Sequence, residues 1–173
     1  MRLNSLEDLF VRELQGLYDV ENQLMKALPK MADKASYTEL QNAIREHYEQ
    51  TKNQSQRLEQ VFDTIGQKAK AEKSEGIRGI IDECEDMAGM SGEPAAIDAG
   101  IIASAQKVEH FEIASYGTVC TYAEMLGHQQ AVQLLRQTLE EEKETDKKLT
   151  ALAERLINVE AVRTAGAQHR LEE

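Results

Sequence analysis

Residues 108–118 read VEHFEIASYGT and lie in a longer segment whose apolar residues recur at helical spacing. Glu109 and Glu112 fall on the face of this helix that should be apolar. Burying an unpaired carboxylate is costly, because desolvation and neighbouring like charges disfavour its ionised form. The stretch therefore predicts a helix whose inner face carries charge, and the rest of the sequence has to explain why.

The same spacing continues toward the N-terminus and predicts two long helices there. The first starts after Ser5, which with Asp8 resembles a capping box, and Pro29 predicts a kink near its end. The second is expected to start at another capping box, formed by Ser36 and Glu39. Together these segments predict one helical hairpin.

A second hairpin is predicted in the C-terminal half. Pro94 suits the first turn of a third long helix, Gly127 suits its C-cap, and a fourth amphipathic helix follows. The 27-residue connection 67–93 contains a short amphipathic segment, 77–90. This order predicts an all-α protein: a ferritin-like four-helix bundle with one long crossover that carries a short extra helix. A coiled-coil rod is the alternative, which the long connection disfavours.

Length and composition limit the domain count and the partners. The 173 residues suit one bundle domain, 1–163, followed by a C-terminal tail, 164–173. The net charge of −11 disfavours nucleic acid and anionic lipid, and attracts cations. The N-terminus lacks a signal-peptide h-region, and no apolar run is long enough for a membrane span. Cys84 and Cys120 have no CxxC spacing and are expected to be reduced thiols. These features predict a cytoplasmic protein.

Hairpin geometry brings several polar residues to one level of the bundle. In an antiparallel pair, residues equally distant from the turn lie at about the same height. Glu112 and Glu142 each lie fifteen residues from Gly127, and in the first hairpin Glu21 and His47 fall within about one turn of the matching level. One polar interruption in each helix therefore points to a shared interior site.

A divalent cation would remove the repulsion among these carboxylates. Oxygen-rich ligands with one imidazole suit iron or manganese, and zinc is also compatible, with one or two ions per chain. The predicted ligands are Glu21, His47, Glu109, Glu112, Glu142 and Asp146, with Gln50, Thr51 and Gln54 within about a turn of them. The alternative is that individual interior glutamates face solvent or pair with a lysine, for which Lys52, Lys107 and Lys143 are the candidates.

Four stretches are distinctive: LYDVENQL, HYEQTKNQSQRLEQVF, SAQKVEHFEIASYGT and LEEEKETDKKLTALA. Over residues 6–159 the chain resembles the YciE/YciF family of bacterial stress-associated ferritin-like proteins. The resemblance implies a ferritin-like bundle, a homodimer and a di-metal site related to that of rubrerythrin-like proteins. It also implies a weakened second metal position, because Gln50 stands where family members often carry Glu. The ligands that it implies are Glu21, His47, Glu109, Glu112 and Glu142.

Three functions remain open at this level. The first is a di-iron or di-manganese oxidoreductase that reduces oxygen or peroxide, and the second is metal binding or buffering without turnover. The third is a structural or interaction role for a helical dimer whose metal site is degenerate. A dimer is expected to form through the outer faces of the long helices, where the apolar residues Val11, Ile113 and Val132 need cover.

Overall fold

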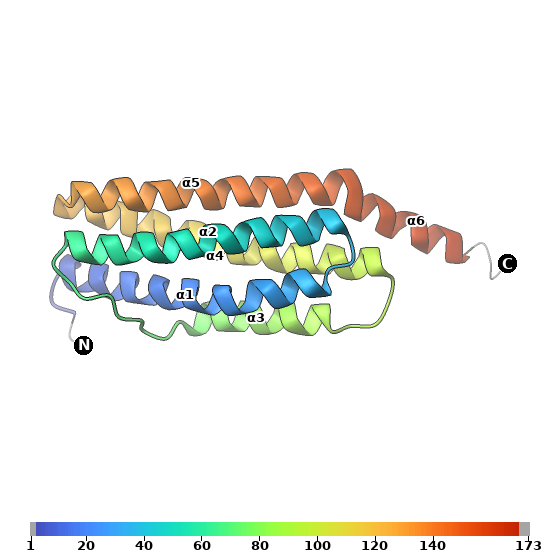
Figure 1. The fold of residues 1–173 in the computed structure, drawn as a ribbon, viewed down its shortest axis with the longest axis horizontal. Helices are drawn as coiled ribbons and strands as arrows, with labels where there is room; N and C mark the ends of the chain where they lie inside the picture. The colour runs from blue at the N-terminus through green and yellow to red at the C-terminus, as the bar shows by residue number, and fades with distance from the viewer. Residues whose placement is uncertain (1–2, 170–173) are drawn as a thin grey trace.

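The computed structural model describes residues 3–169, in which six α-helices and one short π-helical turn follow one another along the chain (Figure 1). α1 (Leu6–Lys34) and α2 (Thr38–Thr64) form one antiparallel hairpin, and α4 (Pro94–Leu126) and α5 (Gln129–Leu152) form the other. α1 packs on α2 and α4, while α5 packs on α4 and α2, so that the four long helices enclose one interior. The all-α class and the helical bundle are confirmed.

The connection between the hairpins runs back along the bundle and carries α3 (Glu75–Ala88), as predicted (Figure 1). α3 covers α1 and α4 from outside. The approach to α4 is close, because a Cβ atom at Gly76 would lie 2.8 Å from the ring of Phe111. α3 therefore covers the bundle from outside and leaves the interior to the four long helices.

The C-terminal part departs from a plain helix. α5 passes into a π-helical turn (η1, Ala153–Ile157) and then into α6 (Asn158–His169), which extends beyond the end of the bundle (Figure 1). Residues 164–169 of the predicted tail continue α6, and residues 170–173 lie outside the described part of the chain. The domain boundary at residue 163 stays a prediction.

Local chemistry explains three helix ends. Ser5 Oγ accepts a hydrogen bond from the amide of Asp8 (3.1 Å) and caps α1. Pro94 occupies the first turn of α4, and Gly127, with φ of 79°, adopts the left-handed conformation that ends the helix. These ends are confirmed as predicted. Pro29 lies inside α1, and the kink there stays a prediction.

The capping box predicted for α2 is wrong. Ser36 and Glu39 are exposed, and the side chain of neither caps the helix. The amides of Ser36 and Tyr37 instead donate to the buried carboxylate of Asp98, on α4, at 2.8–3.0 Å. The start of α2 is thus stabilised by a carboxylate that reaches it from another helix.

Replacing Asp98 by Ala is expected to lower the free energy of unfolding by about 2 kcal/mol, because the part-buried amides of Ser36 and Tyr37 lose their acceptor. The matched variant Ser36→Ala keeps the backbone donor and is expected to change stability by less than about 0.5 kcal/mol. Urea unfolding of both variants measures the difference. Equal losses would mean that the Ser36 side chain contributes to the cap after all.

Two apolar clusters divide the interior and leave a polar layer between them. On α1, the cluster residue Leu17 belongs to one end and Leu24 to the other, with Glu21 between them. The same order recurs on α2, α4 and α5, where the intervening buried polar residues are His47, Thr51, Gln54, Ser55, Glu109, Glu112, Thr138, Glu142 and Thr145. The two apolar clusters hold the four long helices in place, and the positions of the helices in turn determine where the polar side chains lie.

The surface gives less support to a dimer than the sequence suggested. Val11 and Val132 are only 7% and 5% exposed within the single chain, and Ile113 is half-buried. The first two are therefore covered within the single chain, and the expectation that they need cover from a partner is wrong. The homodimer itself stays a prediction, which sedimentation tests.

Two other sequence expectations concern the thiols and the membrane. Cys84 and Cys120 are buried and free, as expected. Among residues 3–169, every helix is too short or too polar to cross a bilayer.

Candidate metal centre

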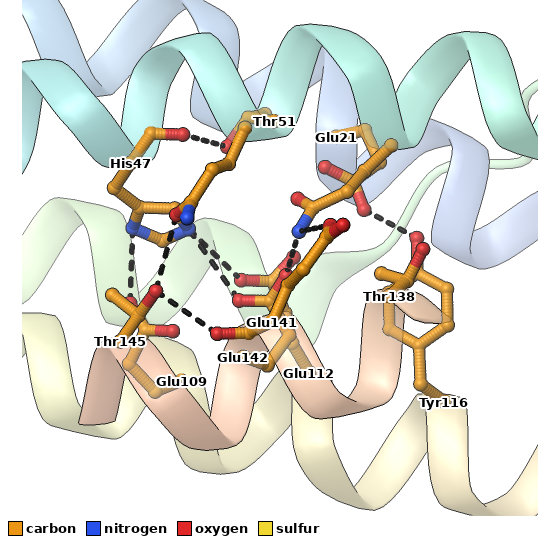
Figure 2. A network of polar contacts seen from close by, with 12 residues as sticks. Glu21, His47, Thr51, Glu109, Glu112, Tyr116, Thr138, Glu141, Glu142 and Thr145 are labelled. Carbon is orange, nitrogen blue, oxygen red and sulfur yellow. Dashed lines mark hydrogen bonds and ion pairs between the residues drawn. The ribbon is translucent and has the colours of Figure 1, made fainter. Parts of the chain in front are cut away.

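Four side chains from three helices converge in the polar layer: His47 on α2, Glu109 and Glu112 on α4, and Glu142 on α5 (Figure 2). Each offers one ligand atom, and these atoms all lie within 4.8 Å of one another. All four side chains are buried. We call these four residues the His47 cluster.

The imidazole of His47 faces carboxylates with both of its nitrogen atoms. Nδ1 lies 3.0 Å from Oε1 of Glu109. Nε2 lies 3.5 Å from Oε2 of Glu142 and 3.9 Å from Oε2 of Glu112. The cluster therefore concentrates three carboxyl groups around one nitrogen base.

This concentration shifts the protonation equilibria of the metal-free protein. Burial raises the pKa of Glu109 to about 7, although the neighbouring His47 opposes the rise. Burial, and then the charge of Glu142, raises the pKa of Glu112 well above its ordinary value. Burial alone would lower the pKa of His47, but Glu109 and Glu142 outweigh it and raise that pKa. Without a cation, protons must hold the cluster together.

Glu21, on α1, lies beside the His47 cluster but is not part of it. Its Oε1 accepts a hydrogen bond from the hydroxyl of buried Tyr116, and its Oε2 has no hydrogen-bond partner (Figure 2). Burial, and then the charge of Glu142, raises the pKa of Glu21 to about 8. The structure thus brings Glu21 within electrostatic reach of the cluster, and its role as a ligand stays a prediction.

Asp146 is not brought to the cluster. Its side chain is 21% exposed, and Oδ1 lies 3.2 Å from Nε2 of Gln106 and 3.4 Å from Nε2 of His110. Thr145 occupies the inward position on this turn of α5. The predicted ligand set therefore loses Asp146: Leu135, Glu142 and Leu149 keep the expected inner face of α5, but Thr145 takes the inward position between the last two.

On α2, Gln54 rather than Gln50 contacts the His47 cluster. Gln50 is half-buried, and its Oε1 accepts a hydrogen bond from Thr145 Oγ1 at 3.2 Å. Gln54 is fully buried, and its Nε2 donates to Oε1 of Glu142 and, at 3.1 Å, to Oε2 of Glu141. The signal for Gln54 was its place on the inner stripe of α2, together with His47.

The lysines proposed as alternative partners are occupied at the surface. Lys52 pairs with Glu49 at 2.8 Å, Lys107 with Glu83 at 2.7 Å and Lys143 with Glu140 at 2.7 Å. None of these pairs includes a residue of the His47 cluster. The surface-pairing explanation for the interior glutamates is therefore wrong for the lysines that were considered.

The residues present fit a cation. Among residues 3–164, whose side chains the structure describes, eight buried side-chain atoms have no hydrogen-bond partner, and all belong to the polar layer: Glu21 Oε2, His47 Nε2, Gln54 Oε1, both carboxylate oxygens of Glu109 and of Glu112, and Glu142 Oε2. Buried polar atoms are rarely left without a partner in native proteins. A divalent ion bound by carboxylate oxygens and one imidazole nitrogen would satisfy those that belong to the His47 cluster.

Comparisons with known proteins give a consistent relationship. Residues 5–162 match the family described as a domain of unknown function, DUF892. Protein YciF of Escherichia coli (strain K12) is 43% identical over 162 residues, which cover 93% of this chain and 98% of YciF. The crystal structure of the E. coli stress protein YciF matches with a TM-score of 0.87, covering 90% of this chain and 99% of that one.

Two further solved structures are similar. YcfI of Rhodopseudomonas palustris, provisionally described as a structural protein, is 41% identical with a TM-score of 0.84, covering 86% of this chain and 94% of that one. A protein from Xanthomonas campestris pv. campestris, at 23% identity and a TM-score of 0.75, shares the fold over 93% of this chain and 99% of its own.

Proposed function

The chain belongs to the YciF-like DUF892 family, and on that premise we propose that it is a ferritin-like metal-binding protein. The His47 cluster holds a divalent iron or manganese ion inside the bundle. Its physiological setting is a bacterial stress response, by analogy with the E. coli relative described as a stress protein. Zinc is a competitor for the same ligands.

The main support for the proposal is that the four side chains of the His47 cluster converge and that their ligand atoms lack hydrogen-bond partners. His47, Glu109, Glu112 and Glu142 place ligand atoms within 4.8 Å of one another. The same four side chains account for most of the buried atoms that lack a hydrogen-bond partner. A site that served only for packing would not concentrate charge in this way, because each unpaired buried carboxylate costs stability.

Each residue has a definable role toward the ion. Glu109, Glu112 and Glu142 neutralise its charge, and His47 supplies a neutral nitrogen through one ring atom while the other faces a carboxylate, which orients the ring. The two apolar clusters exclude water from both sides. Bound iron or manganese would supply redox chemistry toward oxygen or peroxide.

Metal binding without turnover is the second candidate. It is favoured by the complete burial of the carboxylates, since Glu109, Glu112 and Glu142 expose none of their surface to a substrate. A helical protein that stores or buffers the ion fits this burial. Peroxide consumption by the metal-loaded protein separates the two candidates, since buffering alone leaves the peroxide concentration unchanged.

The proposal predicts tight binding of about one ion per chain by the wild-type protein. Calorimetric titration of metal-free protein with Mn(II), and anaerobically with Fe(II), measures it. Glu142→Gln is expected to weaken binding by about 100-fold or more, since changes outside the ligand shell already cost about 10- to 100-fold. Glu140→Gln, on the same helix but 71% exposed, is the matched control and is expected to leave binding unchanged.

Elemental analysis of protein purified without a metal-affinity tag complements the titration. We expect iron or manganese in the wild type and a clear loss in Glu142→Gln. Absence of binding in the wild type, or identical isotherms for the two glutamate variants, would contradict the metal centre and leave a structural role as the remaining function.

A further inference from the structure

The buried amide of Gln54 is held by a chain of contacts that begins at the half-buried Arg57. The guanidinium makes a two-point ion pair with Glu141, with its NH1 atom 2.9 Å from Oε2 and its NH2 atom 3.0 Å from Oε1, and NH1 also donates to Thr138 Oγ1 at 2.6 Å. Such a bidentate pair fixes the carboxylate plane. Glu141 therefore presents a defined acceptor to Gln54.

The orientation of the Gln54 amide follows from these acceptors. Nε2 donates both to Glu141 and to Oε1 of Glu142. A reversed amide would place its oxygen against two carboxylates, so that both contacts would become repulsive. Gln54 Oε1 is left without a partner in the opposite direction. The amide is thus locked with its donors toward Glu142.

This lock determines how Glu142 can bind metal. Its Oε1 is engaged by the amide, and only Oε2 is free of hydrogen bonds and faces His47. A carboxylate that bridges two ions uses one oxygen for each ion. Glu21 is restricted in the same way, because Tyr116 engages its Oε1 and leaves only Oε2 free. Glu142 and Glu21 therefore each keep one oxygen that accepts no hydrogen bond, and the oxygen that already accepts one has only its second lone pair left for a cation.

We propose that Gln54 is a positioning residue that limits the centre to one ion, by holding Glu142 as a one-oxygen ligand beside His47. The inference rests on the proposed metal-binding function and specifies its stoichiometry. The residue that weakens binding of a second ion is then Gln54, on the inner stripe of α2, and not Gln50, which contacts Thr145.

Gln54→Glu tests the lock directly, because it removes the donor and adds an anionic oxygen at the same place. Mn(II) titration is expected to rise from about one ion per chain in the wild type to about two in the variant. Ions that share a carboxylate lie about 3.5–4 Å apart, so the electron paramagnetic resonance spectrum should change from isolated to magnetically coupled Mn(II). Gln50→Glu, the same change one turn away on α2, is the matched control and should keep one isolated ion.

A second variant tests the same inference if Gln54→Glu does not fold. Gln54→Met has a similar length and removes only the amide, so it should admit a second, weaker Mn(II) without adding charge. One isolated ion in the wild type and in both Gln54 variants would overturn the inference alone. Two coupled ions in the wild type would also overturn it, whereas no Mn(II) in the wild type would contradict the proposed function itself.

Discussion

Replacing Glu112 by Gln is expected to have opposite effects on the stability of the metal-loaded and metal-free protein. With metal, the variant loses an anionic ligand and the stabilisation that binding provides, which is about 2.7 kcal/mol when the free ion stands at about 100 times its dissociation constant. Without metal, the same change removes a buried carboxyl group that resists ionisation. The metal-free variant should therefore be more stable than the wild type above pH 5, and a metal-loaded variant should melt earlier.

The pH dependence of the metal-free protein has a defined sign. Burial raises the pKa of Glu109 to about 7 and that of Glu21 to about 8, so the folded state keeps protons that the unfolded chain releases above about pH 4.5. The contribution of these groups to the free energy of unfolding is therefore fully present below pH 4.5. It falls as the pH rises toward 8, by about 1.4 kcal/mol per pH unit for each proton retained. Glu112→Gln removes one such group and should make the fall shallower.

Thermal unfolding of both forms between pH 5 and 8, with and without Mn(II), measures these effects. Glu124→Gln is the control on the same helix, because Glu124 is exposed and pairs with Arg136 at the surface, where one ion pair contributes little. A metal-loaded Glu112→Gln protein that melts above the loaded wild type would contradict the assignment of Glu112 as a ligand.

Replacing His47 by Gln is expected to destabilise both forms. In the metal-free protein the carboxylates raise the pKa of His47, so its imidazolium is the positive charge of the cluster. Removing one partner of a buried ion pair costs about 3 kcal/mol or more. The metal-loaded protein loses its nitrogen ligand as well. The two substitutions thus agree in the loaded protein and have opposite signs in the metal-free protein.

His110→Gln is the matched control for this second prediction. His110 lies next to Glu109 in sequence, but its side chain is 69% exposed, and it is expected to change stability by less than about 0.5 kcal/mol. Urea unfolding at pH 7 of the metal-free wild type and of the two histidine variants provides the measurement. A metal-free His47→Gln protein as stable as the wild type would show that protonated carboxyls alone hold the cluster.

Some helix ends could be predicted from neighbouring residues in the chain, whereas another depends on a residue that only the tertiary structure brings near. Ser5, Pro94 and Gly127 act through their own neighbours in the chain, so that the sequence was sufficient to predict them. The start of α2 looked equally clear, yet its amides bind Asp98, which is 62 residues from Ser36. No local motif contains that carboxylate, because only the packing of α4 brings it there.

The metal centre shows the same division. Helical periodicity and equal distances from the turns determined that Glu21, His47, Glu109, Glu112 and Glu142 share one buried level. Tertiary structure decided which borderline positions join them: Gln54 faces Glu142, whereas Gln50 and Asp146 do not reach the cluster. Successive residues on a helix differ by about 100° in direction, so a small rotation exchanges one neighbour for another. That rotation is fixed by how the apolar clusters pack at the two ends of the bundle, which involves all four long helices at once.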